Sequence, residues 1–97
     1  MKNQINLAIQ ILPRSTSKHP YDIVDRAIEI IKESGVKYLV CPFETVMEGD
    51  YDQLMNIVKK VQIACYEFGA DEIITNIKIQ SSNIKAVEID DKIGKYK

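Results

Sequence analysis

Residues 41–50 of the chain read Cys41-Pro42-Phe43-Glu44-Thr45-Val46-Met47-Glu48-Gly49-Asp50. This stretch places two carboxylates, a hydroxyl and an aromatic ring between a proline and a glycine, in the middle of a regular pattern of strands and helices. Polar groups gathered at a tight connection usually mark a ligand site or an interface. Residues 45–49 alternate as a strand, and Pro42 has no N–H with which to continue the strand before it, so the stretch predicts a hairpin.

The chain before this stretch predicts a strand, a helix and a second strand. Residues 4–12 alternate, with Ile5, Leu7, Ile9 and Ile11 on one face and Asn6, Ala8, Gln10 and Leu12 on the other. An amphipathic helix of roughly 15 residues then begins at Pro20 and ends at Gly35. We expect His19 to be a solvated residue of the cap region. The second strand is expected over residues 36–41.

The chain after this stretch predicts a second helix and a fourth strand. Asp50 is a suitable N-cap, and Gln53 three residues later completes a capping-box pattern. An apolar stripe follows at helical spacing until Gly69, which is expected to terminate the helix. Residues 72–79 alternate as a strand, and the tail from Ile84 is compatible with a short helix that carries Ile84, Val87 and Ile93.

The order βαββαβ predicts a single α+β domain over residues 1–97 with a ferredoxin-like fold, in which two helices cover one face of a four-stranded antiparallel sheet. The right-handed crossover rule leads us to expect the first and fourth strands in the centre and the second and third at the edges. The uncovered face would then carry amides beside apolar side chains. Such a mixed face favours sheet-to-sheet association with a ligand site along the seam.

Composition excludes several classes of function. The 97 residues have a formal net charge of −1 and a pI near 5.8, so no field would gather nucleic acid or an anionic membrane. No apolar run approaches the roughly 18 residues that span a bilayer. Cys41 and Cys65 form no metal-binding pattern, and we expect both to be buried, reduced thiols in a cytoplasmic protein.

The residues offer little for catalysis or for a metal. Glu44 and Glu48 could act as an acid/base pair, but no Ser/His/Asp or Cys/His set accompanies them. Together with Asp50 they would make at best a weak oxygen site for a hard cation. The four glycines form no phosphate-binding pattern. We therefore expect a non-catalytic protein without cofactor or metal.

A small organic ligand, neutral or cationic, fits the remaining polar and aromatic residues. Aromatic rings could stack on a heteroaromatic ring, a hydroxyl and amides could bind its edge, and a carboxylate could neutralise a positive charge. The candidate ligand-binding residues are Gln10, Tyr38, Phe43, Glu44, Thr45, Glu48 and Asn76.

The sequence also resembles a known family. Pro42 to Asp50, preceded by Tyr38 and followed by Ile73-Ile74-Thr75-Asn76-Ile77-Lys78-Ile79, is similar to the thiamine-binding protein family of small YkoF-like domains. The resemblance implies a ferredoxin-like domain that pairs its sheets into dimers or tetramers. It also implies binding of thiamine or its hydroxymethylpyrimidine-like moiety without turnover. Thr45, Glu48 and Gly49 match the hairpin motif of the family, and Asn76 and Lys78 match its last-strand motif.

Two other functions stay open at this point. The chain could be a structural or regulatory oligomer whose open sheet face binds another protein. It could also be an enzyme that uses Glu48 as a general base on a thiamine-like substrate.

Overall fold

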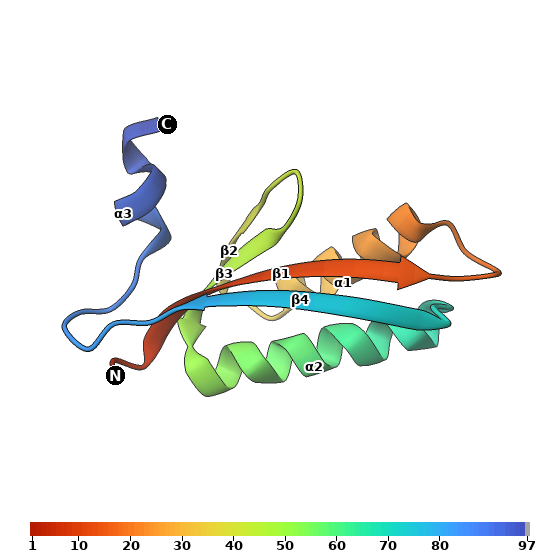
Figure 1. The fold of residues 1–97 in the computed structure, drawn as a ribbon, viewed down its shortest axis with the longest axis horizontal. Coiled ribbons are helices and arrows are strands. Elements are labelled where there is room, and N and C mark those ends of the chain that lie inside the picture. Colours follow the sequence, from red (N-terminus) through yellow and green to blue (C-terminus); the bar gives the residue numbers. More distant parts are fainter. Residues whose placement is uncertain (97) are drawn as a thin grey trace.

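The computed structural model describes residues 1–96 and has the predicted order βαββαβ, followed by a short C-terminal helix (Figure 1). Two helices, α1 and α2, pack on one face of a four-stranded antiparallel sheet, which confirms the ferredoxin-like α+β fold. The elements are β1 (Gln4–Arg14), α1 (Pro20–Glu33), β2 (Lys37–Val40), β3 (Thr45–Asp50), α2 (Tyr51–Phe68), β4 (Glu72–Gln80), α3 (Ile89–Ile93) and a 3-10 turn (Gly94–Tyr96).

The strand order is β2-β3-β1-β4, so one part of the predicted topology is wrong. The first and fourth strands are neighbours, as expected, but the centre of the sheet is formed by β1 and β3, and β4 lies at an edge. Each crossover through a helix skips one strand position. The position between β1 and β2 is filled by β3, and the position between β3 and β4 is filled by β1.

The core lies between the sheet and the two helices, as the alternation in the sequence predicts. The sheet contributes the fully buried residues Ile5, Leu7 and Met47 to the core, and the helices contribute the fully buried residues Ile23 and Leu54. The other face of the sheet is not covered by α1 or α2, and we call it the open face.

Cys65 is buried in the core as expected, whereas Cys41 is only half-buried just beyond the end of β2, so its predicted burial is wrong.

The N-terminal ends of α1 and α2 are capped in different ways. His19 is the N-cap of α1, and its Nδ1 accepts a hydrogen bond of 3.1 Å from the Tyr21 N–H, as a cap-region role predicts. The capping box predicted for α2 is not formed, because the Asp50 side chain accepts no capping hydrogen bond. The N–H of Tyr51 donates instead to the backbone carbonyl of Asn3 at 3.0 Å, which ties the start of α2 to β1.

The C-terminal segment, residues 84–96, lies on the side of the sheet opposite α2 (Figure 1). Only Ile89–Ile93 is α-helical, so the helix is shorter than a tail helix starting at Ile84 would be, and the Ile84 side chain is exposed. Val87 and Ile89 are buried. The segment therefore covers one end of the open face, which the sequence had left bare.

Candidate functional site

The predicted ligand-binding residues lie on two different faces of the sheet. Tyr38 pairs with Met47 and packs against the core, and Thr45 is buried opposite Ile9, so both side chains face the helices. The side chains that border the open face are those of Gln10, Glu44, Glu48 and Asn76. The expectation of one site formed by all seven residues is therefore not met. Successive side chains of a strand point to opposite faces of the sheet, and this separates the predicted residues.

A pocket of about 320 Å³ lies on the open face between β1, β3 and β4, and we call it the open-face pocket. Ala8 and Val46 line it with small apolar side chains. The Glu44 carboxylate lies 3.2 Å from the ammonium of Lys78 in an ion pair. Its lining residues are Asn6, Ala8, Glu44, Val46, Lys78, Ile79, Gln80 and Lys92.

Two amide side chains lie next to this pocket on neighbouring strands. Gln10 on β1 pairs directly with Asn76 on β4, and the Asn76 Nδ2 donates a hydrogen bond of 3.2 Å to the Gln10 Oε1. Lys78 is two residues from Asn76 on the same strand and therefore projects from the same face. A carboxylate, an ammonium and two amides are thus arranged along one stretch of the open face.

The C-terminal segment closes the other end of the open-face pocket. The Asn6 side chain accepts a hydrogen bond of 2.5 Å from Lys92 and donates one of 3.3 Å to the Val87 carbonyl. Glu48, which we predicted to bind ligand, accepts a hydrogen bond of 2.7 Å from the Ile89 N–H. Glu48 therefore holds the segment in place, and this use competes with direct binding of a ligand.

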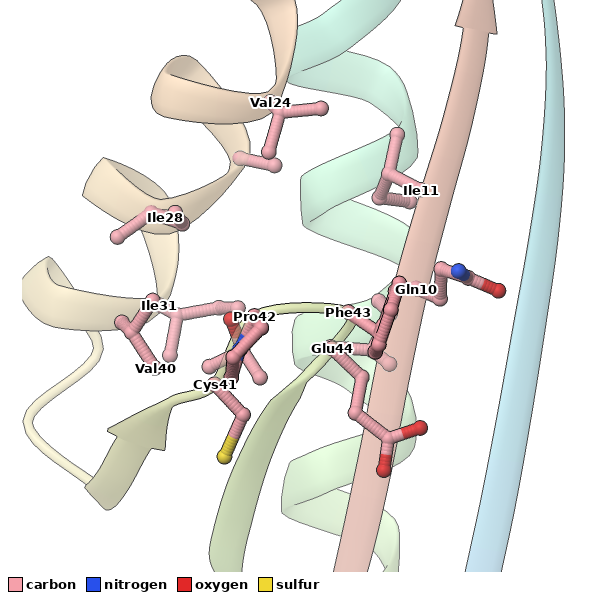
Figure 2. Close-up of a pocket in the computed structure, with 13 residues that line it drawn as sticks. Gln10, Ile11, Val24, Ile28, Ile31, Val40, Cys41, Pro42, Phe43 and Glu44 are labelled. Atoms are coloured by element: carbon pink, nitrogen blue, oxygen red, sulfur yellow. The ribbon is translucent and has the colours of Figure 1, made fainter. Parts of the chain in front are cut away.

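A smaller pocket of about 90 Å³ lies on the helix side, between the 41–45 turn, β1 and α1, and we call it the hairpin pocket (Figure 2). Val24, Ile28 and Ile31 of α1 line one wall. Phe43 lines the pocket and is 82% exposed at the tip of the hairpin. Figure 2 shows the side chains of Gln10 and Glu44 directed away from α1, so the polar groups leave this pocket mainly apolar.

A third depression, of about 360 Å³, lies where β1 ends and α1 begins. Leu12, Tyr21 and Ile74 form much of its lining, and its charged residues are Arg14 and Glu72. None of the seven predicted residues lines it.

Lys37 of β2 forms a charged contact with the C-terminal segment. The pKa of Lys37 is raised by its hydrogen bond to Asp90, whose carboxylate lies 2.6 Å away, and further by the charges of Asp90, Glu48 and Glu88.

Within residues 1–96, no group of three or more His, Cys, Asp or Glu side chains is arranged to hold a metal ion. No helix in the same range is long and apolar enough to cross a membrane.

Asn6, Lys78 and Lys92 line the open-face pocket but are not among the seven predicted residues, although the sequence placed Asn6 and Lys78 on the uncovered face. Asn6 was visible as an amide in the middle of an apolar strand, and it is buried in the structure. Lys78 was visible by its parity with Asn76. Lys92 gave no local signal, because only the fold of the C-terminal segment brings it to Asn6.

Comparison with known proteins places this geometry in context. The family model described as thiamine-binding protein matches residues 7–97. A UPF0045 protein of Clostridium perfringens is 45% identical over 95% of this chain and 96% of its own length. A UPF0045 protein of Methanothermobacter thermautotrophicus is 32% identical over 86% and 83% of the two chains.

Two solved structures have the same fold over nearly the whole chain. A domain of unknown function from Bacillus cereus has a TM-score of 0.92 and 41% identity, covering 98% of this chain and 91% of that chain. A Thermotoga maritima protein, whose description assigns it to thiamine biosynthesis or salvage, has a TM-score of 0.87 and 28% identity, covering 97% and 99%.

Proposed function

Because the chain belongs to the thiamine-binding protein family, we propose that it binds thiamine or a related aminopyrimidine without converting it. The observation that carries the proposal is the Glu44–Lys78 ion pair of 3.2 Å beside the hydrogen-bonded amides of Gln10 and Asn76. The site is the open-face pocket, extended along β1 and β4 to these amides.

Glu44 supplies the charge that a thiazolium cation requires. Its side chain is 28% exposed, so it is partly shielded from water, and its charge is partly neutralised by Lys78. Lys78 is 78% exposed and can swing into solvent, which would free the carboxylate for a ligand cation. A charge-assisted contact of this kind is stronger than a contact between neutral groups. Ala8 and Val46 offer apolar surface for the ring.

The amide pair matches the edge of an aminopyrimidine. Their mutual hydrogen bond uses the Asn76 Nδ2 and the Gln10 Oε1. The Asn76 Oδ1 is then an acceptor and the Gln10 Nε2 a donor that a ligand could use. An aminopyrimidine presents an amino donor next to a ring-nitrogen acceptor, which is the complementary pattern.

Calorimetric titration tests the proposal with two ligands, thiamine and the uncharged hydroxymethylpyrimidine. Glu44→Gln should weaken thiamine binding about tenfold, which is about 1.4 kcal/mol, and leave the uncharged pyrimidine nearly unaffected. Asn76→Ala should weaken both ligands. Glu67→Gln, an exposed carboxylate on α2, is the matched control and should weaken neither. Absence of both heat and thermal shift at millimolar thiamine would contradict the proposal.

A second candidate function is a structural or regulatory oligomer that associates through the open face. Leu12 is 46% exposed and Ile74 is 55% exposed on adjacent strands, and Leu39 is also exposed on this face. Packing of two sheets through these side chains would bury them and would also close the open-face pocket from above. Dimers or tetramers whose association is weakened by Leu12→Lys, but which bind neither ligand, would favour this alternative.

A further inference from the structure

The side chains around the open-face pocket form three rows across the strands of the sheet. Residues of one row are paired on neighbouring strands, and successive rows are two residues apart along β1. From first to third, the rows are Gln10–Asn76, Val46–Ala8–Lys78 and Glu48–Asn6–Gln80. The first and third rows are four residues apart, which is about 13 Å along the strand.

The three rows offer different polar groups. The first row is neutral and presents two amides. The second row contains the ion pair of 3.2 Å between Lys78 and Glu44, which directly precedes β3. The third row receives the ammonium of Lys92 from the C-terminal segment, and this ammonium donates to the Asn6 Oδ1 at 2.5 Å.

Lys92 differs from the other lysines that contact this part of the molecule. Lys37, Lys78 and Lys85 each lie within 4 Å of a carboxylate oxygen. Lys92 donates instead to a neutral amide, and within residues 1–96 it forms no ion pair. A ligand anion can therefore bind Lys92 without first displacing a carboxylate.

Binding of a cation at Glu44 would leave a second lysine without its partner. The thiazolium takes the place of Lys78 at the Glu44 carboxylate, and Lys78 and Lys92 then both line the open-face pocket. Ala8 and Asn6, the residues of β1 beside them, are two positions apart, which is about 7 Å. Two ammonium groups in one pocket repel each other, and an anion between them removes this repulsion.

We propose that the ligand is a phosphate monoester of thiamine and that Lys78 and Lys92 bind its phosphate, an inference that rests on the function proposed above. A phosphate monoester has three strong acceptor oxygens and carries close to two negative charges at pH 7, so both ammonium groups can donate to it. Thiamine monophosphate is a linear molecule of aminopyrimidine, thiazolium and phosphate. The rows present amides, then Glu44, then Lys92 in the same order.

The third row also contains a carboxylate, that of Glu48. It accepts a hydrogen bond of 2.7 Å from the Ile89 N–H, so its charge is directed at the C-terminal segment. Lys92, Asn6 and Gln80 line the open-face pocket at this end, and Glu48 does not. The phosphate would therefore meet an ammonium and amide groups rather than the carboxylate.

Calorimetric titration of the full-length protein with thiamine and with thiamine monophosphate tests the phosphate site. The wild type should bind the monophosphate about tenfold more tightly than thiamine, because two charge-assisted contacts are added. Lys92→Gln should remove most of this preference, and Lys92→Arg, which keeps the charge, should retain it. Lys95→Gln changes an exposed lysine of the same segment and is the matched control, with an unchanged preference. Raising the salt concentration should reduce the preference of the wild type.

The phosphate ester of hydroxymethylpyrimidine tests the order of the rows. A single carbon joins its phosphate oxygen to the ring, so a pyrimidine held by Gln10 and Asn76 leaves the phosphate short of Lys92. This phosphate should therefore improve binding much less than the phosphate of thiamine does. An equal improvement in the two ligands would overturn the proposed arrangement.

Two further results would overturn the phosphate site. Equal affinity of the wild type for thiamine and its monophosphate would remove it and leave the proposed binding of thiamine intact. Equal weakening of both ligands by Lys92→Gln would give Lys92 a purely structural role, as a contact of Asn6. Binding of neither ligand by the wild type would contradict the proposed function itself, and the phosphate site with it.

Discussion

The Glu48 carboxylate accepts a 2.7 Å hydrogen bond from the Ile89 N–H, so a residue at the centre of the sheet holds a residue near the C-terminus. Two lysines strengthen this connection. Lys37 of β2 forms an ion pair of 2.6 Å with Asp90, and Lys92 donates to Asn6 at 2.5 Å. The C-terminal segment is therefore attached to β1, β2 and β3 by charged and polar contacts, and it contributes Lys92 to the lining of the open-face pocket.

Glu48→Ala should release the C-terminal segment without unfolding the sheet. A hydrogen bond to a charged group contributes about 1.5–3 kcal/mol, and Glu48 lies on the open face, away from the core. We expect amide exchange in residues 87–93 to accelerate at least tenfold, while exchange in β1 and α2 changes little. Glu67→Ala on α2 is the control and should leave the exchange rates of the segment unchanged. Unchanged rates in Glu48→Ala would show that the lysine contacts suffice.

Most of the fold could be predicted from periodicity, but the strand order could not. The alternation of β1 correctly identified Ile5 and Leu7 as core residues, and Gly35 and Gly69 correctly marked the ends of the helices. The isoleucines of β4 are typical of a central strand, yet β4 lies at an edge. Side-chain composition does not encode connectivity. Each helical crossover skips one strand position, which the other pair's strand fills, and this decides that β1 and β3 are central.

The candidate site was predicted in part. Glu44, Gln10 and Asn76 lie together on the open face. The placement of Gln10 and Asn76 follows from the strands that carry them, and Glu44 directly precedes β3. Thr45 lies on the same side of β3 as Met47, which is buried against the helices, so the Thr45 side chain faces the helices and not the open face. The contacts of Asn6 with Lys92 and of Glu48 with Ile89 join residues far apart in the sequence, and no local pattern predicts them.

Gly69→Ala should destabilise the protein more than Gly35→Ala. Both glycines have positive φ, 80° at Gly35 and 131° at Gly69. An added Cβ at Gly35 meets no atom within 4 Å, so only the backbone cost of about 1–2 kcal/mol applies. At Gly69 the Cβ would lie 2.8 Å from the Lys18 Cγ, and Lys18 stacks over the Phe68 ring.

Urea unfolding of the two variants measures this difference. Gly94→Ala is the matched control, because its φ is −52° and an added Cβ has open space. Its free energy of unfolding should stay close to that of the wild type. Equal losses at Gly35 and Gly69 would mean that Lys18 moves aside at no cost.

The contribution of Lys37 to stability should disappear at high pH. The pKa of Lys37 is raised above its usual value of 10.5, mainly by the hydrogen bond to Asp90. A raised pKa means that the folded state holds the proton more tightly, so the contribution is complete below about pH 10.5 and is lost as the pH rises through the raised pKa. The difference in melting temperature between wild type and Lys37→Met should shrink between pH 10 and pH 12. A constant difference would contradict this linkage.

The two cysteines should react at very different rates and report where a ligand binds. Burial raises the pKa of the Cys65 thiol, an effect that Arg26 reduces only in part, and Cys65 lies in the core. Cys41 is half-buried and lines the hairpin pocket. The thiolate is the reactive form, so iodoacetamide should modify Cys41 first and Cys65 only when the protein unfolds. Mass spectrometry of the native protein should find a single modified site.

Ligand protection of Cys41 distinguishes the two pockets that Glu44 borders. Thiamine in the open-face pocket lies on the other side of the sheet from α1, so saturating thiamine should change the alkylation rate of Cys41 less than twofold. Thiamine in the hairpin pocket would cover the Cys41 thiol and slow its reaction strongly. Cys41→Ser should bind thiamine as well as the wild type in the first case. Strong protection of Cys41 would move the binding site to the helix side and reassign Glu44 to that pocket.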